Sequence, residues 1–403
     1  MKQLLHTPEG VRDIYNLECA KKLAVQEKLH HVLHLYGYQD IQTPTFEFFD
    51  VFRKEIGTIS SRELYKFFDR EGNTLVLRPD ITPSIARASA TLFSDEPLPI
   101  RLCYIENTFI NQSSYRGKLK ESTQLGAELI GDASVEADAE MLALVIESLK
   151  ASGLEEFQLM VGNAEFFQSI LKEANLTEEE EVRARELITN RNYFGLDEHL
   201  KEIHMSEKTR LTFSHLAELI GGSEILEIAK TYAPNTIARN AIEHLEALYE
   251  ILKIYKVEQY VTFDLSMSGT YGYYTGIVFR GYTYGTGDAV VKGGRYDRLI
   301  GKFGKDLPSI GFAIVVDELL NALSRQKIEV PIRRENVIVL YEKCKEKEAI
   351  GLAQENRSNG KNTHLVLKDP EKTIDDYQRY GKKNLASALI FLGREGEQLR
   401  IEL

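Results

Sequence analysis

The chain has 403 residues, of which 43% are hydrophobic and 28% are charged, and its formal net charge is −11. This length and composition predict a globular protein of two or three domains with a large core. An acidic net charge gives no electrostatic footprint for nucleic acid, although it leaves room for a local basic face, and tRNA binding is not expected. No secretory signal and no apolar run of about 18 residues stand in the sequence, so we expect no membrane span.

The N-terminal part of the chain predicts helices that alternate with strands. A wide apolar stripe predicts a first helix over about residues 16–36, ended by Gly37. Two hairpins follow, one over residues 66–80 with a tight Glu-Gly-Asn turn and one with a long tip over residues 104–128. A helix with Pro83 in its first turn separates the two hairpins.

The remainder of the chain changes character twice. Residues from about 177 to 255 are charged and helix-periodic, which we interpret as a helical insertion in a β-rich core. The insertion begins with Thr177 and Glu180 at capping-box spacing. Strand patterns then resume and end near residue 328, so the core is predicted to comprise residues 1–328. Residues 333–403 alternate as β, α, β, α, β, β, which predicts a small C-terminal α/β domain.

Histidine and cysteine positions give no metal motif. Cys19, Cys103 and Cys344 lie far apart, and such an odd set is typical of a reducing compartment. We therefore expect three buried thiols in a cytoplasmic protein. His30 and His34 are four residues apart on the first predicted helix. Two imidazoles without a third placed ligand indicate an exposed helix face rather than a zinc site, so no metal is expected.

Four separate stretches carry polar side chains that could line one pocket. The candidate side chains are Asp80, Thr82, Gln124, Glu128, Tyr273, Tyr274 and Tyr296. Gln124 and Glu128 share one face of a predicted strand, and Tyr296 follows a predicted turn at Gly293-Gly294 and then Arg295. Carboxylates and tyrosine hydroxyls can bind an amine or an imidazole. Spacing alone favours ordinary local hydrogen bonds at strand ends over a binding site.

These stretches resemble one family in particular. The segments TPEGVRD, TPTFE, LRPDITP, QLGAE, YYTGIVF and GGRYD occur in the same order, and at similar spacing, in histidyl-tRNA synthetases. The resemblance spans roughly residues 7–328, and about the last 70 residues are similar in element order to the anticodon-binding domain of that family. It implies an α+β fold with a class II aminoacyl-tRNA synthetase-like antiparallel sheet core, a helical insertion and a small C-terminal α/β domain. It also implies a homodimer through the core, around Pro44.

The chain departs from this family where ATP would bind. The family has Phe-Arg-x-Glu at the end of the first strand of the long hairpin, whereas Ile110 and Gln112 replace the two charged residues here. Glu318 and Gly269 stand at two further arginine positions of the family. One such charge-stabilising donor is typically worth about 10²–10³ in rate. The resemblance therefore implies a chain that forms no adenylate, with no catalytic residues and no cofactor.

The amino-acid side of the pocket is retained. The resemblance assigns the seven candidate side chains to histidine, with Asp80 on the α-amino group and Glu128 facing the imidazole. The substrate carboxylate lacks its usual arginine, and Arg116 or Lys118 on the hairpin tip are the candidates to replace it.

A synthetase-like chain with a histidine pocket and no ATP machinery is similar to the regulatory subunits of ATP phosphoribosyltransferase, a glycosyltransferase. That similarity implies a hetero-octamer with the short-form catalytic subunit, which performs the first step of histidine biosynthesis. Histidine would bind as an effector, and allosteric coupling between two sites would give feedback inhibition. Two alternatives stay open: an active histidyl-tRNA synthetase with altered motifs, and a synthetase-like amino-acid or RNA-binding protein.

Overall fold

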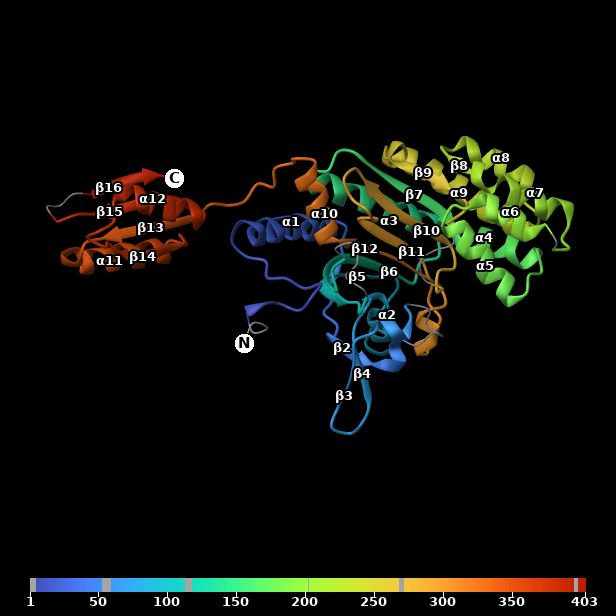
Figure 1. Ribbon diagram of the computed structural model, residues 1–403, viewed down its shortest axis with the longest axis horizontal. Helices are drawn as coiled ribbons and strands as arrows, with labels where there is room; N and C mark the ends of the chain where they lie inside the picture. The colour runs from blue at the N-terminus through green and yellow to red at the C-terminus, as the bar shows by residue number, and fades with distance from the viewer. Residues whose placement is uncertain (1–4, 53–58, 113–117, 202, 268–271, 395–397) are drawn as a thin grey trace. The chain divides into compact units, whose positions relative to one another are not determined.

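The computed structural model describes residues 5–52, 59–112, 118–201, 203–267, 272–394 and 398–403 (Figure 1). The chain forms two compact units, one of residues 1–12 and 25–329 and the other of residues 13–24 and 330–403. The larger unit is built on a nine-stranded sheet and the smaller one on a four-stranded sheet. The candidate site residues all belong to the larger unit.

The nine-stranded sheet forms the centre of the larger unit. Its strands are β1 (Gln39–Asp40), β5 (Ile100–Phe109), β6 (Glu121–Ile130), β7 (Phe157–Asn163), β8 (Ile220–Gly221), β9 (Val261–Asp264), β10 (Ile277–Thr283), β11 (Val291–Arg295) and β12 (Ser309–Val315). They lie in the order β1-β5-β6-β12-β11-β10-β7-β9-β8. Neighbours pair antiparallel, except that β1 runs parallel to β5 and β7 runs parallel to β9. The mainly antiparallel core predicted from the resemblance is therefore confirmed.

Several helices precede residue 330. They are α1 (Asn16–Leu35), α2 (Thr82–Leu92), α3 (Val135–Ala151), α4 (Ala164–Glu173), α5 (Glu178–Thr189), α6 (Tyr193–Leu200), α7 (Glu207–His215), α8 (Glu224–Tyr232), α9 (Thr236–Tyr255) and α10 (Val316–Arg325). α3 contacts β12 and α9, and its residues 141–146 are fully buried because the helix is apolar all round at this point. α1 confirms the first predicted helix. Gly37 follows it with a φ of 81°, a conformation that glycine adopts without strain.

The predicted insertion is helical. α5 to α9 lie between β7 and β9 in the chain, and Figure 1 shows α4 to α8 gathered at one end of the sheet. α5 begins with the predicted capping box, in which Thr177 N donates to the Glu180 carboxylate at 2.7 Å and Glu180 N donates to Thr177 Oγ1 at 3.4 Å. The sequence does not predict β8 inside the insertion, because two residues are too few to show a period-2 pattern.

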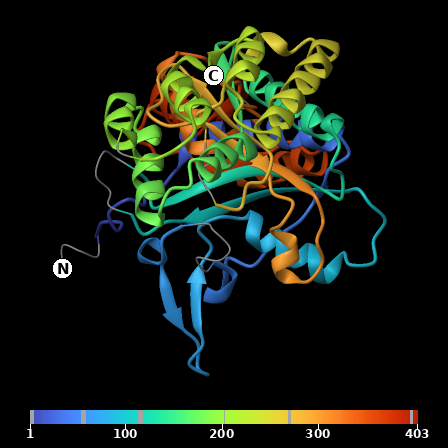
Figure 2. The ribbon, with the colours of Figure 1, turned by 90° about the vertical axis from the view of Figure 1, so that its right-hand side faces the viewer.

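A small separate sheet contains the first predicted hairpin. Its strands are β2 (Phe46–Phe48), β3 (Lys66–Phe68) and β4 (Thr74–Leu77), in the order β2-β4-β3 with antiparallel pairing. The predicted hairpin over residues 66–80 is confirmed, and Gly72 in its turn has a φ of 86°. Figure 2 shows this sheet, in blue, projecting away from the nine-stranded sheet.

The smaller unit contains the predicted C-terminal elements. They are β13 (Asn336–Tyr341), α11 (Glu346–Ser358), β14 (Thr363–Leu367), α12 (Ile374–Lys383), β15 (Ala386–Leu392) and β16 (Gln398–Glu402). β13 pairs parallel with β14 and β15, and β16 pairs antiparallel with β15. The predicted order β, α, β, α, β, β is confirmed. β13 is apolar on both faces because helices cover a parallel strand from both sides.

The thiols differ from the sequence prediction. Cys103 is buried, but Cys19 is only partly buried and Cys344 is exposed, so the prediction of three buried thiols is wrong. Cys344 lies in a short connection before α11, where no apolar core covers it. Among the described residues, no helix combines the length and the apolar character that crossing a membrane requires.

Candidate functional site

A hollow opens in the middle of the nine-stranded sheet, over β6, β11 and β12. It encloses about 410 Å³ when its open mouth is counted. Its lining residues are Asp80, Thr82, Gln124, Tyr273, Tyr274, Lys292, Gly293, Tyr296, Gly311, Phe312, Ala313 and Val315. We call this hollow the central pocket. The structure brings six of the seven predicted side chains to its wall, and Glu128 lies directly behind it.

Glu128 is the most deeply placed of the seven. It is 1% exposed, and its carboxylate accepts hydrogen bonds from Thr82 Oγ1, at 2.7 Å, and from the Tyr296 hydroxyl. β6 pairs with β12 so that Glu128 lies opposite Gly311. A Cβ at position 311 would lie 1.5 Å from Glu128 Oε2, so only glycine leaves room for this carboxylate. Three elements therefore fix one acidic group directly behind the pocket wall.

Asp80 supplies a second buried carboxylate. It precedes α2, whose first turn contains Pro83 as predicted. Its carboxylate accepts from Ile81 N at 2.8 Å and from the Tyr273 hydroxyl at 3.2 Å. The loop that carries Asp80 is therefore held from both sides, by its own backbone and by a tyrosine that lies 193 residues away in the chain.

A buried ion pair holds the chain just before Asp80. Arg78 Nη1 lies 2.8 Å from Glu106 Oε2, and both side chains are about 5% exposed. Arg78 Nε also donates to the Asn107 carbonyl at 2.8 Å, and Glu106 accepts from Thr43 N at 2.9 Å. Removing one partner of such a pair leaves an uncompensated buried charge, so we interpret Arg78 and Glu106 as structural.

Burial gives the two pocket carboxyls unusual acidities. It raises the pKa of Asp80 to about 6 and the pKa of Glu128 to about 8, against the opposing effect of their hydrogen bonds. Within the described part of the chain, neither carboxylate has a basic partner in an ion pair. A cationic ligand in the pocket would therefore supply a compensating charge that the described residues do not provide.

The pocket wall also contains three tyrosine rings and the amide of Gln124. The Tyr273 and Tyr274 rings have centroids 4.9 Å apart, and the Tyr273 and Tyr296 rings have centroids 5.9 Å apart. Burial raises the pKa of Tyr274 and of Tyr296 above the usual range, so both hydroxyls stay protonated. The amide oxygen of Gln124 is buried and has no hydrogen-bond partner among the described residues. A donor on a ligand could satisfy it.

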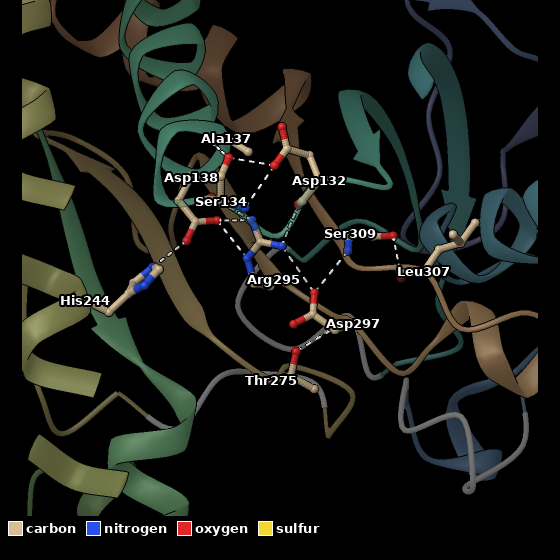
Figure 3. A network of polar contacts seen from close by, with 10 residues as sticks. All are labelled: Asp132, Ser134, Ala137, Asp138, His244, Thr275, Arg295, Asp297, Leu307 and Ser309. Carbon is tan, nitrogen blue, oxygen red and sulfur yellow. Dashed lines mark hydrogen bonds and ion pairs between the residues drawn. The ribbon is translucent and has the colours of Figure 1, made fainter. Parts of the chain in front are cut away.

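Arg295 belongs to a different cluster, which Figure 3 shows. Its guanidinium donates to Asp138 Oδ1 at 2.6 Å and 2.9 Å, and to Asp297 Oδ1 at 3.2 Å. His244 Nε2 lies 2.7 Å from the other oxygen of Asp138. Because successive residues of a strand face opposite ways, Arg295 turns toward α3 while Tyr296 turns into the pocket. Arg295 therefore forms a buried ion pair with Asp138, and we do not interpret it as a ligand-binding cation.

The predicted Gly293-Gly294 turn is wrong. Both glycines lie inside β11, where they pair with β10 and β12. A Cβ on Gly293 would lie 2.3 Å from the Phe279 ring, and one on Gly294 would lie 2.7 Å from the Tyr274 ring. The two glycines allow aromatic side chains to pack flat on the strand, which is a second common reason for glycine in a strand.

Lys292 is a pocket residue that the sequence reasoning missed. It lies two residues before Gly294 and four before Tyr296. Because side chains alternate along a strand, this spacing puts Lys292 on the same face as Tyr296, and the sequence could have indicated it. Its ammonium lies 3.3 Å from Asp288 Oδ2, and its neighbour directly across the β10–β11 pair is Arg280. Like charges on opposite residues of two strands repel, and Asp288 offsets part of that repulsion at Lys292.

The structure describes some of the positions at which the chain departs from the ATP-binding motifs of the family. Ile110 N donates to the Lys120 carbonyl at 2.8 Å, and Asn111 N donates to the Glu63 carbonyl at 2.8 Å. Glu318 lies in the first turn of α10. Gly269 and Arg116 lie outside the described residues. Of the two predicted carboxylate partners, only Lys118 is described, and it is exposed.

Comparison with known proteins gives a consistent result. Residues 10–319 match the family described as Histidyl-tRNA synthetase. An "ATP phosphoribosyltransferase regulatory subunit" of Clostridium kluyveri is 39% identical, over 92% of this chain and 96% of that protein. A protein with the same description from Acetivibrio thermocellus is 38% identical, over 88% of this chain and 85% of that protein.

A solved structure also resembles this chain along nearly its whole length. The crystal structure of an "ATP phosphoribosyltransferase regulatory subunit/histidyl-tRNA synthetase" from Bacillus halodurans superposes with a TM-score of 0.85. It is 32% identical and covers 97% of this chain and 99% of its own. The likeness thus extends through both compact units.

Proposed function

Since the chain belongs to the histidyl-tRNA synthetase-like family and, within it, to the ATP phosphoribosyltransferase regulatory subunits, we propose that it binds histidine and regulates that enzyme. The observation that carries the proposal is the pair of buried carboxyls, Asp80 and Glu128, at the central pocket without a basic partner among the described residues. Free histidine offers two groups that suit them, an α-ammonium and an imidazole.

The pocket chemistry supports a particular orientation of histidine. Glu128 behind the pocket wall would hydrogen-bond the imidazole, and the Tyr296 hydroxyl beside it would keep the ring in place. Asp80 would pair with the α-ammonium, since its pKa of about 6 leaves it mostly ionised at neutral pH. The unpartnered oxygen of Gln124 would accept a further N–H.

Lys292 at the pocket edge supports a place for the substrate carboxylate. Lys292 lines the pocket, its side chain is partly exposed, and its contact with Asp288 at 3.3 Å leaves N–H donors of the ammonium for a ligand carboxylate. An α-carboxylate there would lie on the opposite side of the amino acid from Glu128. We propose that Lys292 performs the role that the resemblance left to Arg116 or Lys118.

The altered ATP motifs support a chain that is not itself an enzyme. Ile110 and Gln112 cannot replace an arginine and a glutamate, and Glu318 would repel a nucleotide phosphate. Since one missing donor costs about 10²–10³ in rate, several missing donors leave adenylate formation without its electrostatic stabilisation. No cofactor is part of this proposal.

We propose that the partner is the short-form catalytic subunit, in a cytoplasmic hetero-octamer with homodimers of this chain. The complex would perform the first step of histidine biosynthesis, and histidine in the central pocket would give feedback inhibition. Such inhibition requires that histidine bind the inactive arrangement of the complex more tightly than the active one.

The experiment is phosphoribosyl-ATP formation by the short-form catalytic subunit of the same source, with and without this chain, under a histidine titration. We expect activity only in the mixture and suppression by histidine. Suppression should disappear in Glu128→Gln and persist in Glu121→Gln, a glutamate on the same strand outside the pocket. An unchanged transferase, or histidine-dependent ATP–pyrophosphate exchange by this chain alone, would overturn the proposal and favour the synthetase alternative.

A further inference from the structure

We propose that His30, His34, Asp40 and Cys103 form a binding site for a divalent transition metal ion of the zinc type. Each residue offers one ligand atom, and these four atoms all lie within 4.8 Å of one another. The set of two imidazoles, one carboxylate and one thiol contains only ligand types that Zn²⁺ accepts. The cluster is separate from the central pocket, and the proposed regulatory function does not use it.

Three elements bring the ligands together. His30 and His34 are four residues apart on α1, so both point from the same helix face. Their ring centroids are 4.1 Å apart. Asp40 lies on β1 and Cys103 on β5, and the parallel pairing of these two strands places Asp40 directly beside Cys103. The site therefore exists only because α1 packs over the edge of the sheet where β1 meets β5.

The distances show that the three protic groups already converge on one carboxylate. His30 Nε2 lies 2.5 Å from Asp40 Oδ1, and His34 Nε2 lies 3.1 Å from Asp40 Oδ2. Cys103 Sγ lies 3.5 Å from Asp40 Oδ1. In a tetrahedral zinc site with bonds of about 2.0–2.3 Å, ligand atoms are about 3.3–3.8 Å apart. Small rotations of these side chains would therefore produce four-coordinate geometry.

The ligand chemistry selects the metal. A thiolate with two imidazoles favours zinc-type ions, whereas Mg²⁺ and Ca²⁺ require oxygen ligands in larger number. Binding would convert the Cys103 thiol to a thiolate and release its proton to water. The exposure of the ligands also favours a metal site. Cys103 is buried, whereas the side chains of His34 and Asp40 are 43% and 57% exposed and can be reached from solvent. The ion would enter from solvent and close the site against the sheet.

This site differs from the expectation drawn from His30 and His34 alone. That expectation rested on the lack of a third ligand near two helical imidazoles. The missing ligands are distant in the chain: Asp40 follows His30 by ten residues, and Cys103 follows Asp40 by 63 residues. A bound ion would join α1 to β1 and β5, so the expected consequence of binding is a more stable packing of α1 on the sheet.

The test is metal binding by the full chain after it has been stripped with a chelator. Zn²⁺ is titrated against a chromophoric competitor, and Co²⁺ is titrated while the visible spectrum is recorded. We expect one ion per chain, intense d–d bands of tetrahedral Co²⁺, and a thiolate-to-cobalt charge-transfer band. Octahedral, weakly coloured Co²⁺, or binding too weak to compete with the chromophore, would overturn the proposal.

Matched variants locate the ion. Cys103→Ser should remove the charge-transfer band, and His34→Ala should weaken Zn²⁺ binding by more than the about 10–100-fold that loss of an outer-shell partner costs. His31→Ala and Cys344→Ser change an exposed residue of the same type outside the cluster and should leave binding unchanged. His34 is exposed, so its variant is expected to fold even where Cys103→Ser does not. Equal loss in the His31 and His34 variants would contradict the assignment.

Discussion

One buried acid lies on one side of β11 and two lie on the other, and they differ in their hydrogen-bonding and ionic partners. On one side Asp138 is saturated, because Arg295 and His244 both contact its carboxylate. On the other side Asp80 and Glu128 receive only neutral hydrogen bonds from described residues. Removing the cation from a buried ion pair is destabilising, whereas a buried acid with a strongly raised pKa and no cation is a candidate ligand-binding group.

The largest expected effect follows from removing the fixed cation. Arg295→Met leaves Asp138 and Asp297 without their guanidinium, and breaking a buried pair typically costs about 3–5 kcal/mol. The free energy of unfolding from denaturant titration measures it. Arg298→Met, an exposed arginine three residues later, should change stability by less than about 0.5 kcal/mol. Similar stabilities for the two variants would show that the Asp138 cluster is not structural.

The second prediction concerns pH and the unpaired side. Burial raises the pKa of Glu128 from its ordinary 4.5 to about 8, so the folded chain keeps a proton that the unfolded chain releases between these values. The favourable contribution is complete below about pH 4.5 and is lost as the pH rises through about 8. Asp80 contributes in the same direction up to about pH 6.

The measurement is the free energy of unfolding across this pH range for the ligand-free chain and for Glu128→Gln. The difference between the two should change by on the order of a few kcal/mol, with the wild-type chain losing stability toward alkaline pH. Glu121→Gln is the matched control and should follow the wild type. A parallel course for wild type and Glu128→Gln would mean that Glu128 titrates normally.

The third prediction concerns histidine itself. Glu128→Gln should weaken histidine binding about 30-fold, because leaving a buried hydrogen-bonding group of the imidazole without its partner costs about 2 kcal/mol. Calorimetric titration of the folded variants measures the dissociation constant. Arg295→Met, if folded, should keep histidine affinity within a few-fold, since Arg295 faces away from the pocket. Loss of affinity in Arg295→Met alone would reverse the assignment of the two clusters.

The smallest effect is expected at the pocket edge. Lys292→Met should weaken histidine binding by about 5-fold, because a partly exposed charged contact contributes about 1 kcal/mol. Histamine, which lacks the carboxylate, should bind wild type and Lys292→Met equally well. Lys302→Met, an exposed lysine, is the control. An equal loss for histidine and histamine would place the substrate carboxylate elsewhere.

Local patterns allowed much of this molecule to be predicted. The capping box at Thr177, the hairpin over residues 66–80 and the order of the C-terminal elements depend on neighbours within a few residues, and all three are confirmed. The seven pocket side chains were found through motif order, and the structure does bring them together. Their assignment to histidine stays a prediction.

Tertiary structure decided the features that depend on distant pairing. The course of Gly293-Gly294 as a strand, the turn of Arg295 toward Asp138 and the meeting of Asp40 with Cys103 all depend on strand register between segments far apart in the chain. Periodicity along a sequence reports which residues share a face, but not what lies opposite that face. The sequence by itself therefore determined the elements and their polar residues. Only the packing of the sheet decided which buried acids have a cationic partner, which have none among the described residues, and which side chains meet at the proposed metal site.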